Sequence, residues 1–398
     1  MRNVDLPVKP SIADGQLYMA TVLTHTALTG GRVAVSLSAI GAHMSPLMIG
    51  VLIALFAVFP MLLATHTGRW IDHVGIRLPL FSGAGLTVLG CFGPAVQVSV
   101  GTLMWSSSAI GVGFMMYQVA MQNLLGRSEL SRRLRNYSRL AMTQSVSAFC
   151  GPVLVGGVLD TLGNRMTFGL LSIFPAVAIA LLLTQRARLR CLTSSGERER
   201  KADTDSLFAE PTVRRILIMN TVLSGAWDTH TFLLPLYGTA IGLSATGVGI
   251  IMAAFAMAAF LARLGTSLAT SRVAPSTLLM VVTVCAACVF AVYPLVNNQE
   301  ELLALSFLLG LALGASQPNV MALLHEAAPP KRIAEAVGLR VALVNMTQFA
   351  IPLGFGALGS ALGTLPLFWG YAFILAALAS WKRWPRRSGT HDQAEERA

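Results

Sequence analysis

Polar side chains at helical spacing run through the first long apolar stretch of this 398-residue chain. They are Thr21, His25, Thr29, Arg32 and Ser36, at spacings of four, four, three and four residues. This spacing places all five on one face of an α-helix. If that helix crosses a membrane, a charge near its centre costs on the order of 2.5 to 3.5 kcal/mol, so Arg32 must face water, a partner or a ligand.

This polar stripe belongs to an internal repeat that covers most of the chain. Residues 45–59 align with 244–258 at an offset of 199, while Pro152 pairs with Pro352 and Gly156 with Gly356 at an offset of 200. At the first offset the stripe falls on Asn220, Ser224, Asp228, Thr231 and Pro235. Two similar halves in a bilayer indicate a substrate path between them.

The composition is that of an integral membrane protein. Apolar residues make up 54% of the chain and charged residues only 12%, and the mean hydropathy is +0.65, outside the range of soluble domains. A hydrocarbon core of about 30 Å needs roughly 20 apolar residues per helix. We predict an all-α membrane protein with twelve transmembrane helices, near residues 17–41, 46–66, 79–98, 101–125, 138–161, 165–184, 213–238, 244–262, 275–296, 301–324, 336–362 and 365–382.

These spans divide into two pseudo-symmetric six-helix bundles. We expect the first bundle at residues 1–184 and the second at 212–398, where the chain ends in a short basic tail. Residues 185–211 mix basic residues with acids and serines, which is typical of a solvated cytoplasmic linker.

The basic residues predict the orientation in the membrane. If the N-terminus is cytoplasmic, all 29 Lys and Arg residues except Arg32 and Arg165 lie at or beyond the cytoplasmic ends of spans. The net charge of +11 then reflects topology and contact with anionic lipid rather than nucleic-acid binding. We expect a monomeric, multi-pass protein of the inner membrane with both termini in the cytoplasm.

The residues that commonly hold metals or perform hydrolysis are not grouped in this sequence. The five cysteines are scattered and odd in number, and Cys285 and Cys288 lie in an apolar span without His or acidic neighbours, so we interpret them as packing residues. The sequence also lacks nucleophile, metalloprotease and phosphate-binding motifs. We therefore expect no metal, no cofactor and no enzyme activity.

The loop after the second span resembles the signature loop of the major facilitator superfamily, G-x-x-x-D-x-x-G-x-[RK]. The matching residues are Gly68, Asp72, Gly75 and Arg77, with Arg69 inside the motif. The twelve spans, the linker and the repeat resemble that family too, and the resemblance implies a cytoplasmic latch that forms and breaks. We expect the two glycines to allow a tight turn and the acid to meet helix N-termini or a basic partner. The alternative is an ordinary charged turn.

A second motif, in the fifth span, is similar to the G-P-x-x-G-G element of the family's proton-coupled drug exporters. It consists of Gly151, Pro152, Gly156 and Gly157, with one extra residue between the proline and the glycine pair. The alternative is that these residues serve only close packing or a kink. The basic residue that such exporters commonly carry in the fourth span is missing, since residues 101–125 contain no Lys or Arg.

Spans one, four, seven and ten line the central cavity in this family, so the resemblance implies that Arg32 and Asp228 face one aqueous space. Arg32 can fork onto a carboxylate or phosphate-like group. Asp228 is the candidate proton carrier, because proximity to Arg32 would favour its charged form and release a proton, whereas separation from Arg32 would allow a proton to bind. The alternative is a permanent salt bridge that holds the bundles together.

Other polar residues complete the predicted cavity. Trp227 could stack on an aromatic or cationic substrate, and His25 could titrate or hydrogen-bond, whereas His230 lies off the stripe and is interpreted as a packing residue. The alternative for the amides is hydrogen bonding between helices. The further cavity candidates are Thr29, Asn220, Ser224, Tyr117, Gln118, Gln317, Asn319, Asn345 and Gln348.

These observations favour secondary active transport by alternating access. Our leading hypothesis is proton-coupled efflux of small amphipathic compounds by an antiporter. The runner-up is uptake or exchange of a small organic anion, which Arg32 would bind. A membrane sensor or scaffold is a third possibility, but no extended soluble domain supports it.

Overall fold

The computed structural model describes residues 12–126, 130–185, 210–268, 275–328 and 333–380, and regular structure in these ranges is entirely helical. The first half contains α1 (Ile12–Gly41), α2 (Pro46–Val74), α3 (Arg77–Val96), α4 (Val100–Gly126) and α5 (Leu130–Thr184). The second half contains α7 (Pro211–Ala240), α8 (Ala245–Leu268), α9 (Pro275–Val292), the 3-10 turn η2 (Tyr293–Leu295), α10 (Gln299–Ala327), α11 (Ile333–Leu362) and α12 (Leu365–Ala379).

The long helix α5 contains two membrane spans. Its helical geometry is interrupted at Gly163, where φ is 75° and ψ is 179°. Glycine adopts a positive φ without the steric cost that a side chain would bring. The chain therefore reverses its direction at Gly163, between the predicted fifth and sixth spans. With two spans in α5, the described helices account for all twelve predicted spans.

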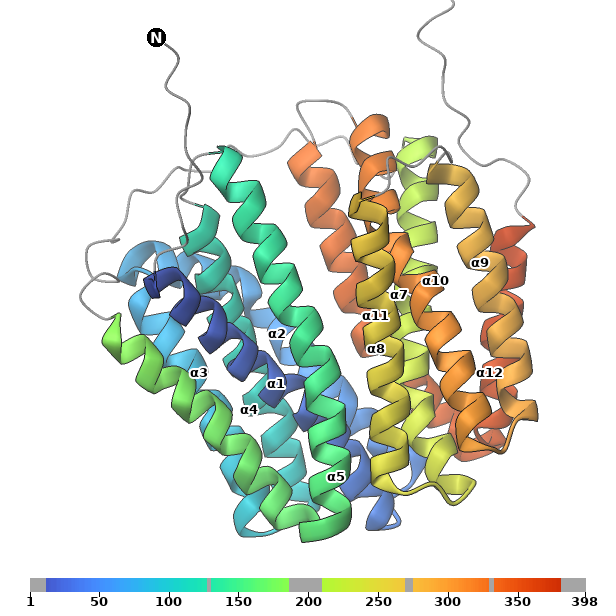
Figure 1. Ribbon diagram of the computed structural model, residues 1–398, viewed down its shortest axis with the longest axis horizontal. Helices are drawn as coiled ribbons and strands as arrows, with labels where there is room; N and C mark the ends of the chain where they lie inside the picture. Colours follow the sequence, from blue (N-terminus) through green and yellow to red (C-terminus); the bar gives the residue numbers. More distant parts are fainter. Residues whose placement is uncertain (1–11, 127–129, 186–209, 269–274, 329–332, 381–398) are drawn as a thin grey trace, which may run out of the picture.

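The helices form two bundles that lie side by side (Figure 1). In the first, α1 packs along α5 and α3 along α4; in the second, α8 packs along α10 and α9 along α12. The bundles touch each other mainly where α2 meets α11 and α5 meets α8. We call the face at which α1 begins and α12 ends the terminal face, and the opposite face the distal face.

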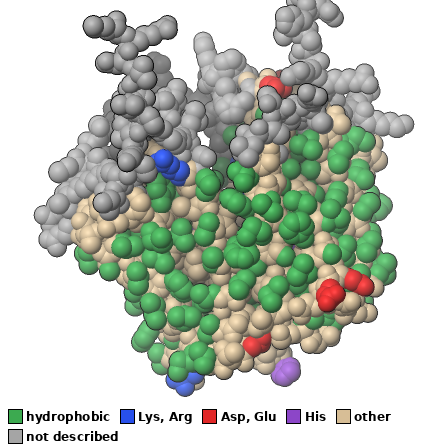
Figure 2. Space-filling model, viewed as in Figure 1, with side chains coloured by type: hydrophobic (Ala, Val, Ile, Leu, Met, Phe, Trp, Pro, Cys, Tyr) green, Lys and Arg blue, Asp and Glu red, His purple; other side chains and the backbone are tan. Residues whose placement is uncertain are grey.

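The outer surface suits a lipid environment. Large apolar side chains such as Leu162, Leu295 and Phe373 are exposed on it, and Figure 2 shows apolar side chains over the whole described height, with charged groups toward the two ends. Among the described residues, seven helical stretches are long and apolar enough to cross a membrane. Helices α1, α4 and α7 are not in that set because polar residues interrupt their apolar sequence, and α12 is apolar but only 15 residues long.

The structure corrects one expectation about the signature loop. Helix α2 continues to Val74, so Gly68 lies inside the helix and only Gly75, with φ of 79°, forms the turn. Arg77 begins α3, with its guanidinium carbon 5.9 Å from the ring centre of Phe81. The side chains of Arg69 and Asp72 lie outside the described residues, as do residues 186–209 of the linker and the basic tail from residue 381.

Candidate functional site

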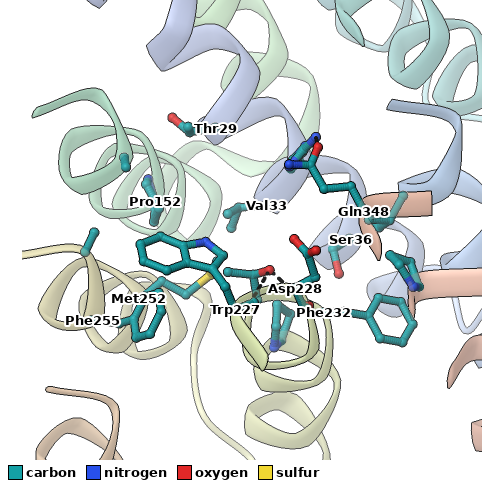
Figure 3. Close-up of a pocket in the computed structure, with 17 residues that line it drawn as sticks. Thr29, Val33, Ser36, Pro152, Trp227, Asp228, Phe232, Met252, Phe255 and Gln348 are labelled. Carbon is teal, nitrogen blue, oxygen red and sulfur yellow. Dashed lines mark hydrogen bonds between the residues drawn. The ribbon is translucent and has the colours of Figure 1, made fainter. Parts of the chain in front are cut away.

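A cavity of about 150 Å³ lies between the two bundles near the middle of the molecule. We call it the central cavity. Figure 3 shows Asp228 of α7 near Gln348 of α11 and Ser36 of α1, and Trp227 of α7 next to Met252 and Phe255 of α8. Its apolar walls include Val33, Phe232, Met252, Phe255, Pro152 and Pro352.

Asp228 is buried, with 8% of its surface exposed. Its Oδ2 atom lies 2.8 Å from the Thr347 hydroxyl of α11, which also lies 2.8 Å from the backbone carbonyl of Val344. A hydroxyl carries one proton and can donate to only one of these acceptors at a time. Thr347 can therefore donate to an ionised Asp228, or accept from a protonated Asp228 while it donates to Val344.

Arg32 lines the same cavity from α1. One of its Nη atoms donates to Oε1 of Gln348 over 3.4 Å, and its guanidinium carbon lies 5.7 Å from the ring centre of Phe56. Within the described residues its Nε has no hydrogen-bond partner, and no ion pair joins Arg32 to Asp228. The permanent salt bridge considered from the sequence is thus not formed in this conformation.

A second, larger cavity of about 480 Å³ adjoins the central one. We call it the inner cavity, because it reaches toward the terminal face between α4, α5, α8 and α11. The two cavities share six lining residues, which are Thr29, Arg32, Ala148, Trp227, Ala256 and Gln348. The other polar residues that line the inner cavity are His25, Gln118, Gln122, Gln144, Ser145, Arg263 and Asn345.

Five predicted cavity residues lie outside these two cavities. The Tyr117 hydroxyl is 3.2 Å from that of Thr21 in the interior of the first bundle, and Asn220 accepts a hydrogen bond from Nε of Arg340 over 3.0 Å. The side-chain amide of Asn319 donates to a carbonyl of its own helix. The other two are Ser224 and Gln317. These polar groups serve packing within the bundles or lie on other helix faces.

The sequence analysis missed Arg263 as a cavity residue. It was counted among basic residues at span ends, yet its guanidinium carbon lies 5.5 Å from the ring centre of Trp227, and Nη1 donates to Ser145 over 3.4 Å. The spacing contained a signal, because Arg263 follows Ala256 of both cavities by seven residues, two turns along the same helix face. Thr347 was missed as well, although it adjoins Gln348.

His230 lies away from both cavities, among the residues of the second bundle. Its Nε2 is 3.1 Å from the Ser306 hydroxyl and 3.3 Å from that of Tyr293. Its ring stacks on Phe255 with centres 4.4 Å apart. This buried position agrees with the packing role expected from the sequence.

The element in α5 brings helices close together. A Cβ atom on Gly151 would collide with Thr29 of α1, and one on Gly156 would collide with Ala245 of α8. Pro152 lines the central cavity, whereas a Cβ on Gly157 would meet nothing within 4 Å. Three of the four residues therefore support packing or the cavity wall.

Comparison with known families gives one match that spans the chain. The family described as "Major Facilitator Superfamily" matches residues 17–300 and 216–398. No curated protein matches the sequence.

Solved structures of transporters share the fold at low sequence identity. A POT family transporter in complex with a thioalcohol conjugated peptide is 13% identical, with a TM-score of 0.77, covering 92% of this chain and 94% of that one. A bacterial homolog of the human lysosomal transporter Spinster, inward-facing and occupied, is 15% identical, with a TM-score of 0.70 and coverage of 94% and 97%. A mutant of the nucleoside transporter NupG is 13% identical, with a TM-score of 0.72 and coverage of 92% and 98%.

Proposed function

The chain belongs to the major facilitator superfamily, and from that premise we propose that this secondary transporter couples proton entry to the efflux of small amphipathic compounds. The two bundles rock about the cavities and expose them alternately to the two sides of the membrane. Both bundles and the whole cavity come from one chain, which supports a monomer as the working unit.

The terminal face is proposed to be cytoplasmic, in the inner membrane. The distribution of Lys and Arg supports this orientation, because positively charged loops are retained on the cytoplasmic side. The contacts between α2 and α11 and between α5 and α8 then lie toward the outside. In this orientation the described conformation is inward-facing, with the inner cavity directed to the cytoplasm.

The pairing of Asp228 with Thr347 is the observation that supports proton coupling. A proton carrier must be stable in both protonation states, and the Thr347 hydroxyl satisfies the carboxyl oxygen in either state. Arg32 lines the same cavity without an ion pair to Asp228 in the described chain. Closure of the gap between them would favour proton release, because a nearby cation favours the charged form of a carboxyl group.

The walls of the central cavity support an amphipathic substrate. Apolar and aromatic side chains from both bundles, including Val33, Phe232 and Met252, lie next to the polar groups of Asp228 and Gln348. A ligand with an apolar body and one polar group would be complementary to such a surface.

The test is transport by purified protein in sealed vesicles, with a compound that stabilises the protein in a thermal-shift screen. We expect Asp228→Asn to lose accumulation driven by a pH gradient but to keep exchange of substrate across the membrane. Glu300→Gln is the matched control, because Glu300 is an exposed acid at the start of α10. Full gradient dependence in Asp228→Asn would refute the proton-carrier role.

The second candidate is uptake or exchange of a small organic anion. Guanidinium groups of Arg32 and Arg263 line the inner cavity, and no Asp or Glu of the described residues does so. A cavity lined by one sign of charge attracts ligands of the opposite sign. Transport of a compound placed on only one side of the vesicle membrane distinguishes the two candidates. Under the same pH gradient, efflux and uptake would move the compound in opposite directions.

A further inference from the structure

The inner cavity carries two arginines, one from each bundle. Arg32 enters it from α1, and Arg263 enters it from α8. Like charges that line one low-dielectric space repel each other, and their repulsion grows as the space narrows. An alternating-access cycle must narrow this cavity at the terminal face, so an anion between the two arginines would ease that step.

Trp227 adds an aromatic wall next to Arg263. Its ring centre lies 5.5 Å from the Arg263 guanidinium carbon, and the ring makes an edge contact with Phe255, with ring centres 4.4 Å apart. It lines both cavities. Charge and aromatic surface thus occur together at one place, which suits a ligand that carries an acid group on an aromatic or apolar body.

Arg32 is held loosely enough to bind such a group. Its hydrogen bond to Gln348 is long, at 3.4 Å, and its buried Nε has no partner within the described residues. A guanidinium presents five N–H donors in a fork that matches a carboxylate. Gln118, Gln144 and Asn345 offer further hydrogen-bonding groups around the same cavity.

We infer that the inner cavity binds amphipathic organic anions, with the acid group between Arg32 and Arg263 and the apolar body against Trp227. This inference deepens the proposed function and rests on it, because it names the charge of the transported compound. An acid group in this position contacts both bundles and offsets the repulsion between their arginines. Substrate binding would thereby promote closure of the terminal face.

The experiment compares three matched sets of probes on the detergent-solubilised full-length protein. These are aromatic carboxylates such as 1-naphthoate, the corresponding neutral amides such as 1-naphthamide, and the corresponding amines such as 1-naphthylmethylammonium. Binding is measured by titration calorimetry and by the shift in Tm. We expect the carboxylates to bind at least tenfold more tightly than the amides, and the amines not to bind.

Variants assign the binding to the two arginines. Arg263→Gln should weaken carboxylate binding at least tenfold, and Arg263→Lys should restore part of it. Trp227→Leu should weaken the binding of the aromatic carboxylates. Arg165→Gln is the matched control, because Arg165 is exposed on the distal face and donates to the Ala95 carbonyl. Equal binding of amides or amines, no binding of any carboxylate, or unchanged binding in a folded Arg263→Gln protein would overturn the inference.

This experiment is independent of proton coupling. Binding is measured at one pH without a membrane gradient, so loss of the proton-carrier role would leave its result unchanged. Conversely, a transporter of neutral compounds could retain gradient dependence and fail this binding test.

Discussion

The bundles meet at two contacts that the internal repeat relates, one between α2 and α11 and the other between α5 and α8. In the first, Gly50 lies against the backbone of Pro352 and Gly356. The N–H of Leu47 at the start of α2 donates to the Ser360 hydroxyl over 2.9 Å. This contact is therefore closed by a neutral side chain.

The second contact has the same backbone packing, but its hydrogen bonds are made to a charged side chain. Gly249 lies against the backbone of Pro152 and Gly156. At the start of α8, the N–H groups of Ala245 and Thr246 donate to the two carboxylate oxygens of Asp160 over 3.0 and 2.6 Å. Asp160 occupies the position in α5 that Ser360 occupies in α11, at an offset of 200.

The comparison separates two kinds of constraint on closing the distal face. Close backbone approach is common to both contacts and can only be met by residues without a side chain. The polar closures differ in strength, because a carboxylate at a helix N-terminus receives charge-assisted hydrogen bonds and the favourable helix dipole. We therefore expect a side chain added at either glycine to be equally disruptive. Loss of the polar side chain should have a larger effect at the α5–α8 contact than at the α2–α11 contact.

The largest effect is expected from Gly249→Ala. A Cβ atom there would collide with the backbone carbonyl of Pro152, which cannot move aside without shifting α5. Transport in vesicles should fall at least tenfold, and Gly50→Ala should have the same effect through Pro352. Gly265→Ala on the same helix as Gly249 is the control, since its Cβ would meet nothing within 4 Å. A large effect at only one of the two glycines would contradict the steric equivalence.

A smaller effect is expected from Asp160→Asn. The amide keeps one acceptor oxygen but loses the charge and the second acceptor, at a cost of about 1 kcal/mol that water at this exposed site reduces further. The conformation with an open distal face should become a fewfold more populated. Spin labels on Leu162 and Leu295, exposed side chains on the distal side of the two bundles, would report it as a longer distance. An unchanged distance distribution would argue against a role of this carboxylate in closure.

The smallest effect is expected from Ser360→Ala. Loss of the hydroxyl leaves the exposed N–H of Leu47 to water, and Ser45 still caps α2 by accepting from Met48. The distal face should open less than twofold more often in the same spin-label measurement. Ser360→Asp sharpens the comparison, because it copies the charged closure of the other contact and should favour the closed state. An equal loss from Ser360→Ala and Asp160→Asn would show that charge is not the difference.

The membrane fold could be predicted from the sequence because its determinants are local. A span needs enough consecutive apolar residues, and a stripe needs only the helical period, so the twelve spans, the repeat and the stripe through Arg32 were recognised directly. The predicted end of α2 was wrong. Gly68 was expected to lie in the turn, but the helix continues through it to Val74. Charged residues after the apolar core of a span do not end its helix.

The cavity lining was predicted only in part. Gln118 and Tyr117 are adjacent in α4 but have different surroundings. Gln118 lines the inner cavity, whereas the Tyr117 hydroxyl lies next to that of Thr21. Asn220 continued the stripe of Asp228 in sequence but contacts Arg340 in the structure. The period of a helix defines which residues share a face, but it does not define which partner that face meets.

The amino-acid sequence alone thus determined that this chain crosses the membrane many times, that its halves are alike, and that a basic and an acidic group lie within its apolar helices. The tertiary structure decided that Asp228 pairs with Thr347, that Arg32 and Asp228 share a cavity without an ion pair in the described chain, and that Arg263 joins Trp227. The physical reason is that hydrophobicity and helical period act within one segment. The choice of neighbour depends on how helices from distant parts of the chain rotate and pack against one another.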